Sequence, residues 1–229
     1  MNRSLKLLLF GFGLLSLAVI LLSVGCGSSG TKFRVMNAVI DESSVDVLLD
    51  GTKVATEAYG VAPTYISVSS GSRHLQIEPT GSSTPFIDQT LSLSSGNNYT
   101  VVAVNFSSSH QALVLSDQNS APASGDIAIR VVNASPGLGA AADIYIVAPG
   151  TDLNTVTATI SDLAFGGVSN YQTLAAGSYE VLFTTPANGG KFIEIDSGTL
   201  SLTAGQVRTV VGLNGQAGGF TDSILADLN

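Results

Sequence analysis

The sequence predicts an all-β protein: two tandem antiparallel β-sandwich domains of immunoglobulin or transthyretin type, which follow an N-terminal signal helix. Short runs of β-branched and aromatic residues recur between Gly- and Ser-rich turns every eight to 12 residues, a pattern typical of short strands. No window beyond the first 25 residues carries the apolar stripe of an amphipathic helix. The second half of the chain also repeats the first, so we expect about seven short strands in each copy of about 90 residues.

Residues 1–25 have the three parts of a secretory signal. Two basic residues lie among the first six, and an uncharged apolar stretch covers residues 7–22. This stretch of 16 residues is shorter than the roughly 20 that a membrane-spanning helix needs. Small residues then lead to Cys26, the one cysteine of the chain. We therefore expect a signal peptide that directs export, followed by a Gly/Ser tether over residues 26–31.

The segment that ends at Cys26 resembles the signal of bacterial lipoproteins. The resemblance implies that Cys26 becomes the first residue of the mature protein and carries a lipid, which would anchor the chain to a membrane. Ser23 stands where such signals usually have Leu, and Leu22 lies one place earlier. Gly27, rather than Asp, implies sorting to the outer membrane or cell surface if the cell is Gram-negative. The alternative is an uncleaved membrane anchor with an incidental cysteine.

The rest of the chain is acidic. Beyond residue 25 it carries seven basic and 17 acidic side chains, a net charge of −10 against −8 for the whole sequence. Such a surface repels phosphate groups, so we expect no nucleic acid partner. A single cysteine excludes a disulfide framework and a cysteine-based zinc site. His74 and His110 have no histidine counterpart in the other repeat, so we expect no metal centre and no cofactor.

An internal repeat organises the chain after residue 30. FRVMNA at residues 33–38 returns as IRVVNA at residues 129–134, and further matches follow in the same order. These matches pair Tyr65 with Tyr171, Thr100 with Thr209, Asn105 with Asn214, and Asp117 with Asp227. We expect one sandwich over residues 32–119 and another over 127–229. Pro and small polar residues in the linker, 120–126, favour a semi-flexible joint.

Glycines mark the turns that precede several strands, because glycine tolerates the positive φ of a tight turn. Four such turns end in Gly71, Gly96, Gly177 and Gly205. Residues 150–165 are expected to form an extra loop and strand in the second repeat.

The second repeat carries four motifs: IRVVNASP at 129–136, ADIYI at 142–146, FGGVSNY at 165–171 and AGSY at 176–179. They resemble the bacterial domain-of-unknown-function family 4397, whose members read RVVNASP, DVY, FG-x-x-S-x-Y and AG-x-Y. In the first repeat Val39-Ile40 replaces Ser-Pro, and Asp46-Val47-Leu48 lacks the Tyr. The resemblance covers residues 32–229 and implies exported, often lipid-anchored, tandem β-domains. It implies no reaction.

Repeated polar residues are expected to serve the fold. Asn37 and Asn133 follow the first strand of each repeat, where an Asn side chain can close a loop by bonding backbone groups. Tyr65 and Tyr171 are expected to be core or corner tyrosines that bond the backbone.

Asp46 and Asp143 alternate with apolar strand residues, so they are expected to point away from the core beside a turn. A calcium site there would need further oxygen ligands. The first repeat offers Asp41, Glu42 and Asp50, whereas the second offers one nearby aspartate. This asymmetry argues against a cation site shared by both repeats.

No catalytic motif is recognised in the sequence. A serine nucleophile on a sharp turn requires G-x-S-x-G, and residues 166–169 lack the second Gly. The glycine-rich turns lack the Lys and helix of a phosphate-binding loop. We therefore expect a non-enzymatic, lipid-anchored envelope protein that presents loops to a protein or glycan partner. The candidate recognition loops are residues 106–110 and 215–220, with Phe106, His110 and Phe220 as their candidate contact residues.

Two other functions stay open. One is a carbohydrate-binding or substrate-delivery module at the cell surface. The absence of Trp speaks against it, because sugar-binding platforms favour flat aromatic rings. The other is an extracytoplasmic hydrolase with two carboxylates about 5–10 Å apart in a cleft.

Overall fold

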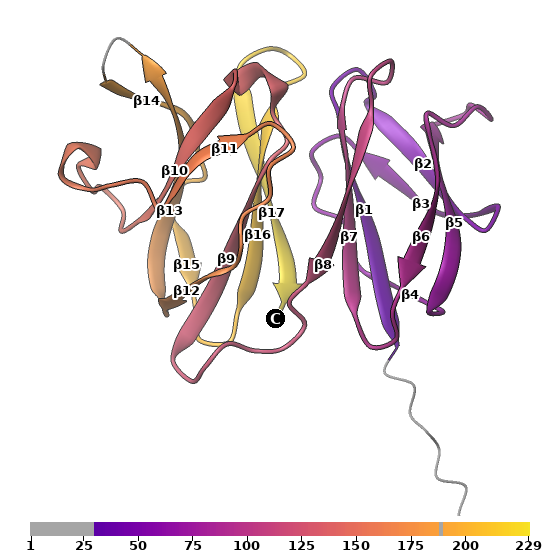
Figure 1. Cartoon of the computed structure of the whole chain (residues 1–229), viewed down its shortest axis with the longest axis horizontal. Helices are drawn as coiled ribbons and strands as arrows, with labels where there is room; N and C mark the ends of the chain where they lie inside the picture. Colours follow the sequence, from indigo (N-terminus) through magenta and orange to yellow (C-terminus); the bar gives the residue numbers. More distant parts are fainter. Residues whose placement is uncertain (1–29, 188–189) are drawn as a thin grey trace, which may run out of the picture.

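Four stacked β-sheets make up the computed structural model, which describes residues 30–187 and 190–229 (Figure 1). Each half of the chain supplies two of these sheets. The all-β sandwich fold predicted from the sequence is therefore confirmed. The expected signal helix and Cys26 lie outside the described residues. Among the residues that are described, no helix is long and apolar enough to cross a membrane.

The first domain is a sandwich of two four-stranded sheets. The strands of inner sheet 1, which faces the second domain, are β1 (Thr31–Val39), β4 (Ile66–Val68), β7 (Asn98–Asn105) and β8 (Gln111–Asp117). Their order across the sheet is β4-β1-β7-β8. The strands of outer sheet 1 are β2 (Ser44–Leu49), β3 (Thr52–Ala58), β5 (Gly71–Pro79) and β6 (Ile87–Leu93). Their order is β3-β2-β5-β6.

The second domain repeats this arrangement. The strands of inner sheet 2 are β9 (Asp126–Asn133), β12 (Gln172–Ala175), β16 (Val207–Asn214) and β17 (Phe220–Leu228), in the order β12-β9-β16-β17. The strands of outer sheet 2 are β10 (Ala141–Val147), β11 (Ile160–Ala164), β13 (Gly177–Ala187) and β14 (Gly190–Asp196), in the order β11-β10-β13-β14. The short strand β15 (Leu200–Leu202) pairs with β13. Two 3₁₀ turns complete the domain, η1 (Pro136–Leu138) and η2 (Leu153–Thr155).

Most neighbouring strands are antiparallel, but the centre of each inner sheet is a parallel pair. β1 runs parallel to β7, and β9 runs parallel to β16. Parallel neighbours need a long crossover, and here the strands of the outer sheet provide it. The domains contain eight and nine strands rather than about seven each, because short edge strands such as β4 and β15 leave little pattern in the sequence.

The two inner sheets pack face to face and are therefore buried on both sides (Figure 1). Nearly every residue of β1, β7, β9 and β16 is buried, whereas β6 in outer sheet 1 alternates. The buried apolar cluster between the sheets, here called the interdomain core, contains Met36, Ala38, Val102, Val104, Leu113, Leu115, Val132, Ala134, Val211, Leu213 and Leu225. A further core lies within each sandwich. This buried contact fixes the domains against each other, in contrast to the semi-flexible joint that the linker composition favoured.

The extra segment at residues 150–165 contains the turn η2 and the strand β11. β11 pairs with β10 as β3 pairs with β2, so the addition to the second domain is the loop rather than the strand.

Of the four turn glycines, Gly71, Gly96 and Gly205 have positive φ. Gly177, the first residue of strand β13, does not.

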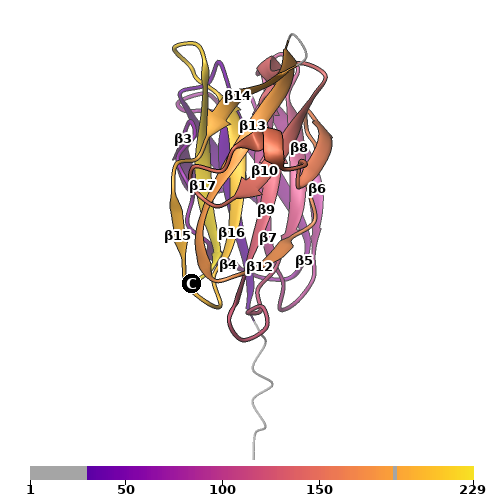
Figure 2. The same cartoon turned by 90° about the vertical axis from the view of Figure 1, so that its left-hand side faces the viewer.

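The chain enters the first domain at one end, and two hairpin turns lie at the other end (Figure 2). β1 begins at Thr31 at the lower end of Figures 1 and 2, where β17 also ends. β7 and β16 run in the same direction as their parallel neighbours. The turns that follow them, residues 106–110 and 215–219, therefore lie at the upper end.

Candidate functional site

A buried polar network lies beside the interdomain core and is built twice. Each copy takes an Arg from the first strand of a domain, a Thr from its parallel neighbour, an Asp from the last strand and a Tyr from the segment before the short edge strand. The members are Arg34, Thr100, Asp117 and Tyr65 in the first domain and Arg130, Thr209, Asp227 and Tyr171 in the second. The Arg, Thr and Asp residues are all buried.

The two arginines cross the domain boundary. Arg34 pairs with Asp227 of the second domain, and its Nη1 donates to the carbonyl oxygen of Ala226 at 2.9 Å. Arg130 in turn pairs with Asp117 of the first domain, and its Nη1 donates to the carbonyl oxygen of Ser116 at 3.1 Å. Each domain thus supplies one cation and one anion to the other, and the two ion pairs are related by the sequence repeat.

The two tyrosines complete the network. The Tyr65 hydroxyl donates to Asp117 at 2.6 Å, and the Tyr171 hydroxyl donates to Asp227 at 2.7 Å. The Arg34 guanidinium lies 4.1 Å above the Tyr65 ring, and the same stacking in the second domain measures 4.6 Å, a favourable cation–π geometry. The tyrosines therefore serve the fold, as expected, but each donates to a carboxylate rather than to the backbone.

The network is electrostatically balanced and closed. Thr100 and Thr209 each donate to the aspartate of their own domain at 2.6 Å, so each carboxylate accepts bonds from Arg, Thr and Tyr. Burial and the charge of Asp117 raise the pKa of Asp227. In the described part of the chain, every buried side-chain nitrogen and oxygen has a hydrogen-bond partner. A network without a free group is suited to holding two domains in register rather than to chemistry.

The two repeated asparagines close loops, as the sequence predicted. The Asn37 side chain accepts from the Val39 amide at 3.0 Å and donates to the Glu42 carbonyl at 2.9 Å. Asn133 accepts from the Ser135 amide at 3.1 Å and donates to a carbonyl of β11. Both asparagines are fully buried, so their bonds stabilise the turn after the first strand of each domain.

Four of the carboxylates considered for a cation site are engaged elsewhere. Asp46 points to the outer face of β2, where it pairs with Lys53 at 2.7 Å, and this contact lowers its pKa. Asp41 accepts from Ser107, and Asp50 pairs with Arg73. Asp143 accepts from a backbone amide of β11. Within the described ranges, no three His, Cys, Asp or Glu side chains gather closely enough to hold a metal ion.

The candidate recognition residues occupy different environments. Phe106 is 43% exposed at the β7–β8 turn. His110 follows in the same turn and contacts the Phe86 ring, with 5.6 Å between ring centroids. Phe220 is half-buried and packs against the second core. His74 lies in β5 and pairs with Asp88 at 2.6 Å. Phe106 therefore projects from the upper end of the molecule, whereas Phe220 belongs largely to the sandwich.

At the upper end, Asn214 contacts Ser135 near the end of the IRVVNASP motif and Gly137 just after it. The side-chain oxygen of Asn214 accepts from the Ser135 hydroxyl at 2.6 Å and from the Gly137 amide at 3.0 Å. A Cβ on Gly137 would lie 2.4 Å from the Asn214 side chain, so any other residue there would force that side chain to move. Tyr59 of the first domain donates to the Asn214 carbonyl at 2.6 Å, and burial raises its pKa to about 12.

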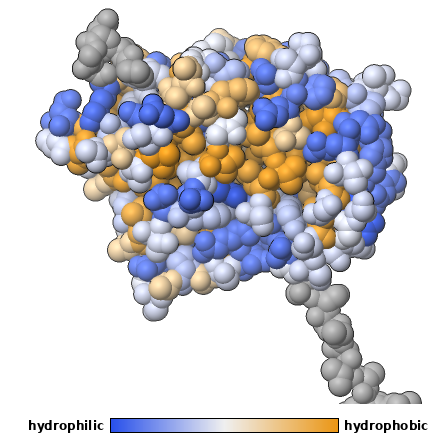
Figure 3. Space-filling model, viewed as in Figure 1, coloured by the Kyte–Doolittle hydropathy of each residue, from blue (hydrophilic) through white to orange (hydrophobic). Residues whose placement is uncertain are grey.

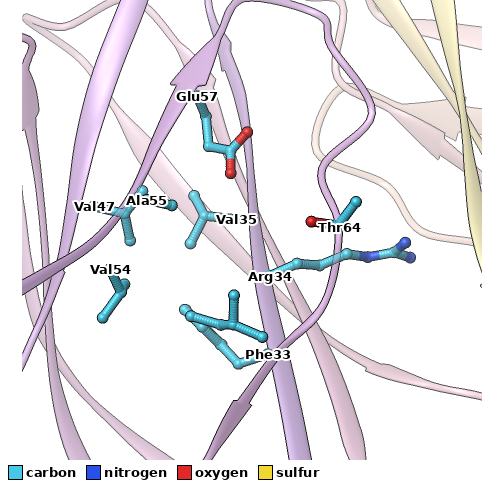
Figure 4. A pocket seen from close by; sticks show the side chains of 9 residues that line it. Phe33, Arg34, Val35, Val47, Val54, Ala55, Glu57 and Thr64 are labelled. Carbon is cyan, nitrogen blue, oxygen red and sulfur yellow. The ribbon is translucent and has the colours of Figure 1, made fainter.

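One hollow lies in the first domain, and a larger one lies between the domains. The smaller one, in the first domain, has an apolar floor that includes Phe33 and Val35, with Glu57 and Thr64 beside it (Figure 4). Its volume of about 10 Å³ is room for one water molecule. Burial raises the pKa of Glu57. The larger hollow is a groove of about 360 Å³ between the domains, here called the β8 groove, which is lined by Val114, Leu115, Ser116, Arg130, Val168, Ser169, Asn170 and Tyr171.

The stacked sheets and the closed network define a tandem β-sandwich protein in which the repeats pack as one unit. The family model described as domain of unknown function (DUF4397) matches residues 31–145 and 139–229. The chain therefore belongs to the DUF4397 family, as the motifs of the second repeat indicated. No match was found among curated proteins.

Solved structures show a distant likeness to the chain. One, described as "Alpha-glucan binding by a streptococcal virulence factor", is 10% identical, with a TM-score of 0.28, and the match covers 84% of this chain and 97% of that one. Another, a leucine-rich repeat protein from Bacteroides thetaiotaomicron, is 12% identical, with a TM-score of 0.20, and the match covers 79% of this chain and 25% of that one. Neither likeness carries an argument about function.

Proposed function

We propose that the protein is a non-enzymatic, lipid-anchored module of the bacterial cell envelope that presents the upper end of its paired sandwiches to a protein or glycan partner. The observation that carries the proposal is the placement of the two ends. The chain enters at Thr31, and the β7–β8 and β16–β17 turns lie at the opposite end. An anchor before Thr31 therefore leaves these turns pointing away from the membrane.

The length of the tether supports this orientation. Five residues lead from Cys26 to Thr31, and an extended chain spans at most about 3.6 Å per residue. The lower end of the molecule would stay within about 18 Å of a lipid on Cys26. Because the interdomain core fixes the second domain to the first, both upper turns would face outward together.

The polar chemistry of the described residues supports a role without catalysis. The most extensive cluster of charged groups is the domain-crossing network, in which each Arg and Asp is already paired. The carbohydrate-binding alternative has less support, because Arg34 and Arg130 cover the rings of Tyr65 and Tyr171. A glycan array probed with the intact protein tests that alternative, and reproducible binding to one class of sugar would favour it.

The anchor is tested by metabolic labelling. The full chain is produced in a Gram-negative host with an alkyne analogue of palmitate, and membrane and soluble fractions are compared for three forms. The wild type and Ser23→Leu should take up the label and sediment with membranes, since both keep the thiol. Cys26→Ser should take up no label and leave the membrane fraction. Equal labelling of Cys26→Ser, or an unlabelled soluble wild type, would refute the proposed anchor.

A further inference from the structure

β8 is an edge strand, and part of its backbone faces outward without a partner. The amides of Lys32 and Ile40 in the first domain donate to the carbonyls of Asn97 and Asn105, so the odd-numbered residues of β7 direct their backbone groups toward β1. The even-numbered residues of β7 then bond to β8. Val101 of β7 lies opposite Val114 of β8. In this register, the backbone N–H and C=O groups of the even-numbered residues of β8 point away from β7.

The lower part of this outward edge is already occupied by the second domain. The carbonyl of Ser116 accepts from Arg130, and the amide of Gln118 donates to the Tyr171 hydroxyl. Higher up, the outward N–H and C=O groups of Ala112 and Val114 form no hydrogen bond with any residue that the structure describes. Unpaired strand edges of this kind are templates for a further strand.

The β8 groove lies beside this free edge. Figure 3 views the side of the molecule that carries β8 and residues 168–171, and apolar side chains gather across the middle of it. Val114 is 46% exposed and Val168 is 37% exposed. The one charged side chain of the groove, Arg130, is paired with Asp117. The lining is therefore effectively neutral, with apolar and hydrogen-bonding groups side by side, and its volume of about 360 Å³ lies in the range of ligand sites.

The pseudo-equivalent edge on the other side of the molecule is different. Ile224 of β17 corresponds to Val114, since both lie three residues before the network aspartate. Ile224 is half-buried and packs against the core of the second domain. The exposed valine on a free edge is thus a feature of β8 and not a general consequence of the repeat.

We propose that the β8 groove binds an extended, uncharged peptide segment of a partner protein, which adds to β8 as a further strand. Free backbone N–H and C=O groups recognise another backbone, and alternate side chains of the added strand would contact Val114 and Val168. A charged side chain would find no free counter-charge in the groove. The proposal deepens the proposed function, on which it rests, by naming the chemical class of the partner.

In the experiment, a library of displayed random nine-residue peptides is selected for binding to the intact protein. The binding of the selected peptides is then compared among the wild type, Val114→Pro and Val114→Thr. Val114→Pro removes the outward amide, and proline is tolerated on the open side of an edge strand. Val114→Thr keeps the amide and the branched shape, so it is the matched control. Peptides selected on the wild type should bind Val114→Thr with similar affinity and lose about tenfold or more on Val114→Pro. The selected peptides should be poor in charged residues. A thermal melt of each variant shows that the fold is retained.

Three outcomes would overturn the proposal: no enriched peptide, enriched peptides that bind Val114→Pro equally well, or enrichment of charged peptides. If Val114→Pro does not fold, Val168→Ser replaces it, because it removes one apolar wall without touching the β8 backbone. The same peptides should then lose affinity. Labelling of Cys26 does not depend on Val114, so a failure of peptide binding and a failure of the anchor are read separately.

Discussion

Replacing Arg34 by Met would leave a buried carboxylate without its main counter-charge. The side chain of Arg34 is 1% exposed and that of Asp227 is 0% exposed, so water cannot replace the lost partner. Removal of one member of a buried ion pair costs about 3–5 kcal/mol. Asp227 keeps donors from Thr209 and Tyr171, and Arg130 lies 3.8 Å away. We therefore expect the lower end of that range, about 3 kcal/mol of the free energy of unfolding.

The measurement is urea unfolding followed by circular dichroism, because the chain has no Trp, with linear extrapolation to water. Lys53→Met is the surface control. The Lys53 side chain is 52% exposed where it pairs with Asp46, and ion pairs with an exposed member contribute about 1 kcal/mol or less. The double variant Arg34→Met with Asp227→Asn removes the orphan charge but keeps an acceptor for Thr209, so it should recover much of the loss. A loss below about 1 kcal/mol for Arg34→Met, or no recovery in the double variant, would refute the reasoning.

Three further predictions concern the interdomain contact and the turn that contains Gly137. The protein should unfold in one calorimetric transition. Leu213→Ala, which opens the fully buried interdomain core, should keep the single transition and lower the free energy of unfolding by about 2–5 kcal/mol. Two separate transitions would contradict a shared core. The penalty of Arg34→Met should be smaller at pH 5 than at pH 8. Burial raises the pKa of Asp227 and the charge of Arg34 lowers it, so the variant should have a higher Asp227 pKa than the wild type, and a raised carboxyl pKa gives stability that is lost as pH rises through it. A pH-independent penalty in urea titrations would argue against this. Gly137→Ala should cost about 1–3 kcal/mol, since its Cβ would lie 2.4 Å from Asn214, and an unchanged Tm would show that the contact can relax.

The sandwich architecture could be predicted from the sequence because its signals are local. Strand-sized apolar runs and turn glycines each act over a few residues, and the repeat shows the same local signals a second time. The packing of the inner sheets also left a signal, in runs such as residues 100–104 (TVVAV). These runs are continuous rather than alternating, which indicates strands buried on both faces. Interpreted in that way, they would have predicted that the two sandwiches share a core.

The polar network could be predicted only in part. Arg34 and Arg130 interrupt apolar strands, and a charge within a buried strand requires a partner. The repeat also aligns Asp117 with Asp227. The alignment cannot show that each Arg pairs with the Asp of the other repeat, because self-comparison shows which residues correspond and not which ones touch. The groove beside β8 depends on the same packing of two domains, so no local pattern in the sequence indicates it.

The exchange of ion pairs makes the chain the covalent equivalent of a symmetric homodimer, in which each half offers the same patch and receives its complement. A substitution at Asp227 removes the ion-pair partner of Arg34, which lies almost two hundred positions earlier. The two halves of the gene are therefore constrained to change together. The linker at 120–126 also becomes dispensable once the chain has folded. A protease that cuts there would leave two fragments clasped by the interdomain core, and the second sandwich would stay attached without a peptide bond to the first.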